Sequence, residues 1–332
     1  MHKIYDDKFS VGRYFPIKKY PPFSIDFVGA HSPLLAHALS ECIAKLPELP
    51  DFGRDKSIAV FSDFGGDHKE AGYATYSFLF CSFDKLPAFE DKVSRLRGDY
   101  NLRCEDEFSF KRIFSGAKKR ALDNFLSIAN AYVHGVLITF AVSKKIDTLF
   151  GVNINDVFHK CSNANGVVSE GSWNKHELER LARVVNFMMF MLSVLAERGH
   201  KIFWYCDNDS INQTSKFRSQ DDITQMFEMM ASLYDIRKDV SMGVAKSFEK
   251  KTYFDDLLSL TDISAGMVQE LMTANFVGDG NIIGSGDKEE AKVKVLKWMA
   301  EDSKFLSKFI VEVVEAENGF LSSRSIDLTP VK

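Results

Sequence analysis

The sequence predicts an α/β protein in which a mixed five-stranded sheet is flanked by helices. Short runs rich in β-branched and aromatic residues alternate with longer segments that have the periodicity of helices. Three strand-like runs come before the long central helix, and each of the last two follows a helix, so a meander with parallel additions is expected. The chain of 332 residues is 45% hydrophobic and 27% charged, which is ordinary for a soluble protein with a large core.

The first region, residues 1–56, is expected to be a helical extension. Ser32 followed by Pro33 fits the cap and first position of a helix that continues through LLAHALSECIAKL. Pro47 and Pro50 mark where the chain leaves this helix. The opening sequence, MHKIYDDKFS, lacks the apolar core of a signal peptide, which favours a cytoplasmic protein.

The central region, residues 57–276, begins with three predicted strands. The first is IAVFSD at residues 58–63, and the second is YATYSFLFCSF at residues 73–83. Their connection, FGGDHKEAG, is rich in turn residues, so the two strands are expected to form a hairpin. Polar sequence that is helical or irregular follows, and the third strand is GVLITFAVS at residues 135–143.

Helices and strands alternate in the second half of the sequence. A helix is predicted in NKHELERLARVVNFMMFMLSVLAERGHK, and its apolar stretch, residues 184–196, is shorter than the ~20 residues that span a bilayer. KIFWYCDND is the fourth strand and VSMGVAKSF the fifth, with a helix at residues 219–235 between them. A helix at residues 253–276 completes the core. The last region, residues 277–332, is expected to be a linker and a helix over residues 288–315.

Three acidic residues far apart in the sequence are brought toward one place by this order of elements. Asp63 ends the first strand, and Asp207 ends the fourth. If these strands are parallel neighbours, both residues lie at the same edge of the sheet, where open α/β sheets bind ligands. The helix after the fifth strand can bring Asp262 to the same edge.

Converging carboxylates repel one another, and a bound cation relieves that repulsion. Mg²⁺ or Mn²⁺ suits such a site, because hard divalent ions prefer carboxylate and water oxygens and can also bind phosphate. Two such ions ~4 Å apart can activate a water molecule and stabilise the leaving oxygen of a phosphodiester. The acids therefore favour phosphoryl chemistry.

At its motifs the sequence resembles the ribonuclease H-like superfamily, and more narrowly a poorly characterised bacterial group within it. In that group the first strand ends Asp-Glu-Ser-Gly-Asp, and the last core helix carries an lADlisG-type motif. The corresponding segments here are DFGGD at residues 63–67, EFSFKRI at residues 107–113, WYCDND at residues 204–209 and LTDISAG at residues 260–266. The resemblance covers residues 58–275, and it departs from the group at Phe64, which replaces the usual glutamate.

The resemblance implies a ribonuclease H-like fold and a divalent-metal-dependent nuclease that cleaves RNA or DNA. The catalytic and metal-binding residues would be Asp63, Glu107, Asp207 and Asp262. Asp63 and Asp207 would bridge or flank the metal ions, and Asp262 would complete the cluster. Glu107 would hold the second ion or orient water.

A basic cluster follows Glu107 in the sequence. Lys111, Arg112, Lys118 and Lys119 are interleaved with phenylalanines, a pattern that can grip a phosphate backbone and stack bases. An amphipathic helix with solvated lysines produces the same pattern. The net charge of −4 gives no overall field toward nucleic acid, so substrate binding would depend on this cluster.

Each candidate acid also has an ordinary structural explanation. Asp63 could cap a turn, Asp207 could form an Asx-turn, and Asp262 could cap a helix that begins at Ile263. Glu107 lies in an acidic run that could be a solvated surface. Asp67 is better explained as a turn residue, and His68 beside it is a weaker candidate for positioning water.

Two other functional classes remain open. A catalytically inactive binding or assembly subunit, for instance in a defence or mobile-element system, would suit Phe64 and the acidic net charge. A phosphatase acting on small substrates would use the same metal ions. Five scattered cysteines without CxxC spacing suggest neither a zinc site nor a disulfide framework. The terminal helices could contact a protein partner or a second copy.

Overall fold

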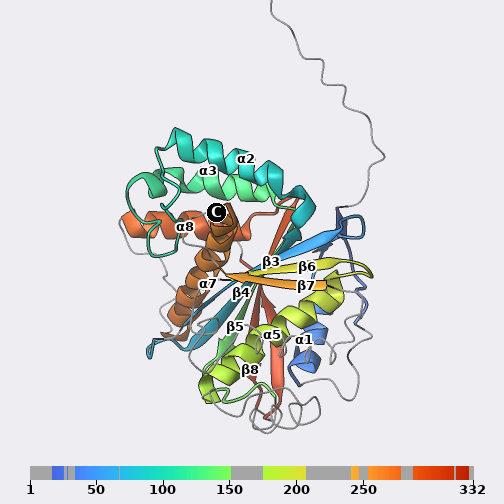
Figure 1. Cartoon of the computed structure of the whole chain (residues 1–332). Coiled ribbons are helices and arrows are strands. Elements are labelled where there is room, and N and C mark those ends of the chain that lie inside the picture. Colours follow the sequence, from blue (N-terminus) through green and yellow to red (C-terminus); the bar gives the residue numbers. More distant parts are fainter. Residues whose placement is uncertain are drawn as a thin grey trace, which may run out of the picture.

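A central mixed β-sheet with helices on both faces forms the body of the protein in a computed structural model (Figure 1). The structure describes residues 17–25, 28, 34–66, 68–150, 175–206, 241–246, 253–277, 287–317 and 319–328. Helices α1 (Leu34–Ala44) and α5 (Lys175–Leu195) cover one face. The other face carries α2 (Leu86–Asp99), α3 (Gly116–Tyr132), α7 (Tyr253–Val277) and α8 (Asp287–Ala300).

The main sheet has seven strands within the described residues, in the order β7-β6-β3-β4-β5-β8-β9. The strands are β3 (Ser57–Gly65), β4 (Tyr73–Ser82), β5 (Gly135–Ser143), β6 (Lys201–Cys206), β7 (Ser241–Lys246), β8 (Leu306–Glu315) and β9 (Leu321–Ile326). A separate short pair joins β1 (Lys18–Lys19) to β2 (Leu49–Pro50), and the turn η1 (Phe83–Lys85) links β4 to α2.

The predicted meander and the predicted parallel strands are both present. Strand β4 is antiparallel to β3 and β5, while β6 is parallel to β3 and β7 is parallel to β6. Strand β3 is therefore a central strand with β4 on one side and β6 on the other. The predicted α/β class and the pairing of the five predicted strands are confirmed. The helix expected at residues 219–235 lies outside the described residues.

The C-terminal region differs from the expectation of a single helix over residues 288–315. Helix α8 ends at Ala300, and the chain then forms β8 parallel to β5 and β9 antiparallel to β8. The prediction was wrong beyond residue 300 because the apolar run FIVEVV is rich in β-branched residues that pack well in a strand. These strands continue the sheet beyond β5, whose edge would otherwise carry unpaired backbone groups.

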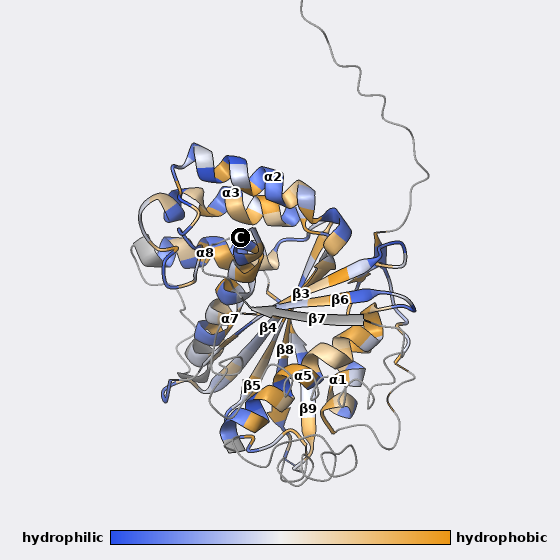
Figure 2. Cartoon of the chain, in the orientation of Figure 1, coloured by the Kyte–Doolittle hydropathy of each residue, from blue (hydrophilic) through white to orange (hydrophobic). Residues whose placement is uncertain are grey.

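Two separate cores hold the helices against the sheet. Along β3, Ile58 and Val60 belong to the core under α1 and α5, whereas Ala59 and Phe61 belong to the core under α7. This alternation follows from the two-residue period of a strand. Figure 2 shows α5 as a largely hydrophobic helix, in agreement with the unbroken burial of residues 181–192. None of the helices in the described ranges has the length and hydropathy of a membrane span.

Lys308 is a cation on β8 that is largely removed from water. Its Nζ donates a hydrogen bond to Asn130 Oδ1 at 2.8 Å and lies 5.3 Å from the ring centroid of Trp298. Burial lowers the pKa of Lys308 from 10.5 to about 8. The folded protein therefore releases this proton at a lower pH than the unfolded chain does.

We expect Lys308 to make the protein more stable as the pH rises from 8 to 10.5. In that window the folded protein has lost a proton that the unfolded chain still binds, so the free energy of unfolding rises with pH, by up to about 3 kcal/mol over the whole window. Urea unfolding of wild type and Lys308→Met across this range measures the effect. The wild-type free energy of unfolding should rise relative to that of the variant. Lys304→Met, at an exposed position, should keep the wild-type pH profile, and parallel profiles for Lys308→Met would contradict the expectation.

Candidate functional site

Asp63 lies near the carboxyl end of the central strand β3. Because side chains alternate along a strand, Asp63 is on the same side as Phe61, which packs in the core under α7. Its side chain is partly exposed, and Oδ1 accepts a hydrogen bond of 2.7 Å from the backbone N–H of Phe64.

Asp262 lies in the interior of α7, nine residues after Tyr253 begins that helix. The alternative that Asp262 caps a helix starting at Ile263 is therefore wrong. Its Oδ2 accepts a hydrogen bond of 2.7 Å from the backbone N–H of Phe110. This partner comes from a distant loop, so the carboxylate joins two parts of the fold.

Helix α7 runs along β3, so Asp262 lies beside the stretch of strand that contains Asp63. At one point the ring centroids of Phe254 and Phe61 are 5.9 Å apart. Three turns further along the helix, a Cβ built on Gly65 would lie 3.8 Å from the carbonyl oxygen of Ala265. Asp262 and Asp63 both fall between these two points of contact.

Small and hydroxyl side chains allow α7 to lie close to the sheet. Thr75 on β4 donates a hydrogen bond of 3.1 Å to the carbonyl oxygen of Ala265. Ser264 Oγ lies 2.8 Å from Thr139 Oγ1 on β5, which in turn donates to Ser77 at 2.9 Å. These hydroxyl groups on β4, β5 and α7 therefore satisfy one another and the helix backbone.

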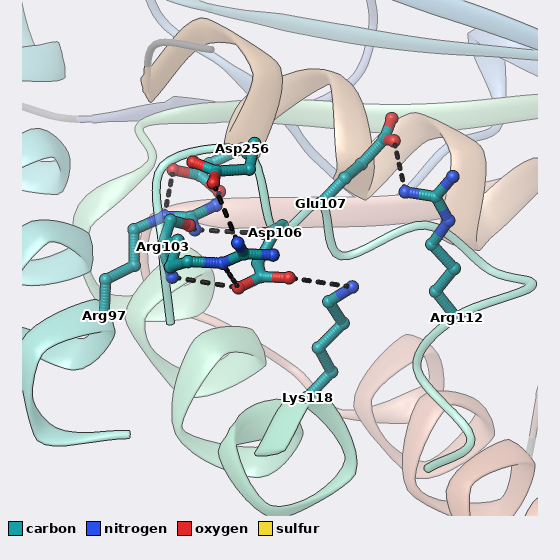
Figure 3. A network of polar contacts seen from close by, with 8 residues as sticks. Arg97, Arg103, Asp106, Glu107, Arg112, Lys118 and Asp256 are labelled. Carbon is teal, nitrogen blue, oxygen red and sulfur yellow. Dashed lines mark hydrogen bonds and ion pairs between the residues drawn. The ribbon is translucent and has the colours of Figure 1, made fainter. Parts of the chain in front are cut away.

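Glu107 lies on the loop between α2 and α3, and this loop packs against α7. Phe108 stacks on Phe125 of α3 with ring centroids 4.2 Å apart. Phe110 lies over Gly266, where a Cβ would come within 2.4 Å of its ring. The Glu107 side chain is 29% exposed and pairs with Arg112 at 3.7 Å (Figure 3). The loop thus brings Glu107 to the face of the sheet that carries α7.

Asp207 lies outside the described residues, as does Asp67. The described part of strand β6 ends at Cys206, whose Cα partner on β3 is Ser62. Asp207 and Asp63 are the next residues in the sequence after this pair. Within the described ranges, no group of three or more His, Cys, Asp or Glu residues could hold a metal ion. Asp63, Glu107 and Asp262 share one side of the sheet without forming such a group.

Most of the predicted substrate-binding cations have acidic partners within the protein. Lys118 Nζ is 3.6 Å from Asp106 Oδ1, and Lys119 Nζ is 2.7 Å from Glu290 Oε2 on α8. Arg112 pairs with Glu107, as described above. Lys111 is exposed on the loop. These pairs reduce the positive charge that the cluster can present to a phosphate backbone.

Phe64 lies on the opposite side of β3 from Asp63. It packs in the core under α5, with its ring centroid 5.9 Å from that of Tyr76 and 6.1 Å from that of Phe78. A carboxylate at position 64 would therefore lie on the α5 side. The replacement of glutamate by Phe64 thus removes no acid from the side of the strand that carries Asp63.

Two further acids near the start of α7 were not among the site residues that the sequence predicts. Asp255 is buried and accepts a hydrogen bond of 3.0 Å from the Tyr205 hydroxyl. Asp256 is buried and bound by the Arg97 guanidinium, with Nε 3.2 Å from Oδ2 (Figure 3). Burial raises the pKa of the Asp256 carboxyl, Asp255 and Glu107 add to that rise, and Arg97 opposes it. The only signal for these two acids in the sequence was the adjacent pair DD in YFDDLL. Such a pair is equally typical of the first turn of a helix.

His68 is held at the turn after β3 by the far part of α7. Its Nε2 lies 2.9 Å from Gln269 Nε2, and its Nδ1 lies 3.5 Å from Glu70 Oε2. Gln269 follows Asp262 by two helical turns, so both residues lie along the same side of α7. The imidazole is about half exposed, with 51% of its side-chain surface accessible. It therefore borders the region of Asp63 and Asp262 without contacting either in the interactions above.

Comparisons with known proteins add little to this geometry. No protein-family model and no curated protein matches the chain. A solved structure described as the complex of PCNA and RNase HII from Archaeoglobus fulgidus matches with a TM-score of 0.31 and 11% identity. The match covers 75% of this chain and 93% of the other. With a TM-score this low, the match carries no argument about fold or function.

We expect Gly266→Ala to destabilise the protein by about 1–3 kcal/mol, because the added methyl group would displace Phe110 and the loop that carries Glu107. Thermal unfolding measures this loss. Gly98→Ala on α2 is the matched control, since nothing lies within 4 Å of the position that its Cβ would take. That change should be neutral or stabilising by up to about 1 kcal/mol. Equal melting temperatures for Gly266→Ala and wild type would contradict the contact.

Proposed function

We propose that the protein is a divalent-metal-dependent nuclease that cleaves phosphodiester bonds in RNA or DNA. The observation that carries the proposal is the placement of Asp63 near the carboxyl end of the central strand, on the side covered by the stretch of α7 that contains Asp262. Ligands of open α/β sheets bind at this edge. The order of β3 to β7 also agrees with the ribonuclease H-like fold that the sequence motifs imply.

The donor set suits Mg²⁺ or Mn²⁺. Asp63, Asp207 and Asp262 would supply carboxylate oxygens, which are the ligands that hard divalent ions prefer. When bound, such ions supply Lewis-acid stabilisation to the oxygens of a phosphodiester. Asp63 and Asp262 are partly exposed, unlike the buried Asp255 and Asp256, so they retain access to solvent and substrate.

Glu107 and the basic residues would act on the substrate side of this site. Glu107 would hold a second ion or orient the attacking water, and a partly exposed carboxylate is suited to either role. Lys111 is exposed and would contact the phosphate backbone. Arg112, Lys118 and Lys119 would have to exchange their acidic partners for phosphate. The protein would act in the cytoplasm, the compartment favoured by the sequence.

Titration of the protein with Mn²⁺ in a calorimeter tests the proposed site. We expect sub-millimolar binding that weakens at least tenfold in Asp63→Asn, Asp207→Asn and Asp262→Asn, because each change removes one ligand charge while preserving size. Asp91→Asn is the control. Asp91 lies on α2 with its side chain 50% exposed and pairs with Arg95, away from the proposed site.

Two results would contradict the proposal. One is a wild-type protein that binds no Mn²⁺. The other is binding that the three site variants leave at the level of Asp91→Asn. Where Mn²⁺ binds, a panel of single-stranded, duplex and hybrid substrates separates a nuclease from a phosphatase, which would instead hydrolyse mononucleotides.

A catalytically inactive nucleic-acid-binding or assembly subunit is the second candidate. The ion pairs of Lys118 and Lys119 with Asp106 and Glu290 favour it, since they leave less cationic surface for a catalytic grip on the substrate. This candidate predicts nucleic-acid or protein binding that is unchanged in Asp63→Asn and needs no divalent ion. Gel-shift measurements with and without Mn²⁺ distinguish it from the nuclease.

A further inference from the structure

Arg97 at the end of α2 is the meeting point of three parts of the fold. Its Nε and Nη2 both donate to the Asp256 carboxylate on α7. Its Nη1 donates to the carbonyl oxygens of Arg103 at 2.7 Å and Asp106 at 3.0 Å. Figure 3 shows the guanidinium between Asp256 and the loop that carries Asp106 and Glu107. A single side chain therefore ties α2, α7 and this loop together.

The contacts of Arg97 lie on both sides of Glu107 in the sequence. The Asp106 carbonyl belongs to the peptide group directly before Glu107. On the other side, the guanidinium carbon lies 5.7 Å from the ring centroid of Phe108, which is itself stacked on Phe125. The backbone of Glu107 is thus held from both neighbours, and this limits the directions its side chain can take.

The loop has its own supports as well. Asp106 Oδ2 accepts a hydrogen bond of 2.9 Å from the backbone N–H of Arg103, and Lys118 lies 3.6 Å from Oδ1. Further on, the Phe110 N–H binds Asp262. Asp256 and Asp262 are six residues apart, or about 9 Å along the axis of α7. Glu107 lies on the loop between these two attachments to the helix.

We infer that Arg97 is a positioning residue that, with Asp256, fixes Glu107 beside the stretch of α7 that carries Asp262. The attachment of the loop to α7 through Arg97 and Asp256, called the clamp below, rests on these contacts alone. The role of Glu107 rests in addition on the proposed function. Both members of the pair are shielded, with 14% of the Arg97 side chain and 3% of the Asp256 side chain exposed, so water competes little with their bonds. A planar guanidinium can serve a carboxylate and two carbonyl groups together, which a lysine ammonium cannot.

Hydrogen exchange of the full chain, followed by mass spectrometry, tests the clamp with Arg97→Lys. We expect the amides of residues 103–113 to exchange at least tenfold faster than in wild type, while those of β4 and β5 keep their rates. Arg95→Lys is the matched control two residues earlier on α2. The Arg95 side chain is 69% exposed and pairs with Asp91, so this variant should exchange like wild type.

Asp256→Asn keeps the size of the side chain and removes its charge, and it should give the same local acceleration. Wild-type rates for residues 103–113 in Arg97→Lys would overturn the clamp. Uniform acceleration of loop and sheet in both variants would overturn it as well, because the pair would then support the whole fold rather than the loop.

Mn²⁺ titration separates the clamp from the proposed function. If wild type binds Mn²⁺, Arg97→Lys should weaken that binding by about threefold to tenfold, and Arg95→Lys should not. Unchanged affinity in Arg97→Lys despite a loosened loop would overturn the positioning role. If wild type binds no Mn²⁺, the proposed nuclease fails, and the exchange rates still decide whether Arg97 holds the loop.

Discussion

The close approach of α7 to strands β3 and β4 is the constraint on which the candidate site depends. It is possible because the facing positions are small or carry short hydroxyl groups, such as Gly65, Thr75 and Ser264. Larger side chains would lift the helix and leave its polar contacts with the sheet unmade. Because α7 lies so close to the sheet, Asp262 lies beside the end of the strand that carries Asp63.

The same helix organises the layer that covers it. The loop after α2 is attached to α7 through Phe110 at Asp262 and Gly266, and through Arg97 at Asp256. The loop therefore forms an outer layer that is not part of the sheet, and Glu107 lies in that layer. A shift in the position of α7 would therefore move the loop, since both attachments of the loop are to residues of this helix.

Burial divides the acids of this region into two kinds. Asp255 and Asp256 are buried, and each has a specific side-chain partner, Tyr205 or Arg97, as expected where an unpaired charge would be costly. Asp63 and Asp262 are partly exposed and accept hydrogen bonds from backbone N–H groups. The first kind holds the fold together, whereas the second kind keeps part of its surface in contact with solvent.

Local patterns in the sequence were enough to predict five strands of the central sheet, because hydrophobic periodicity and turn residues act over a few neighbouring positions. They identified β3 to β7. The sequence interpretation took the adjacency of β3 and β6 as a condition, and the pairing of Ser62 with Cys206 confirms that condition. The same local reasoning failed at β8, where a strand follows a helix closely and the apolar run FIVEVV fits either period when read without its partner β5.

The pairing of charges, in contrast, was settled by the packing of the folded chain. Arg97 and Asp256 are separated by 159 positions, and Lys119 reaches Glu290 on a different helix. No local pattern encodes such pairs, since they depend on the angle and depth at which the helices pack. The sequence did not show that Phe64 lies on the opposite side of β3 from Asp63, because the predicted strand ended at Asp63 whereas β3 continues to Gly65. It placed Asp262 in a helix, but only the packing of that helix against the loop after α2 decided that its carboxylate accepts a hydrogen bond from Phe110.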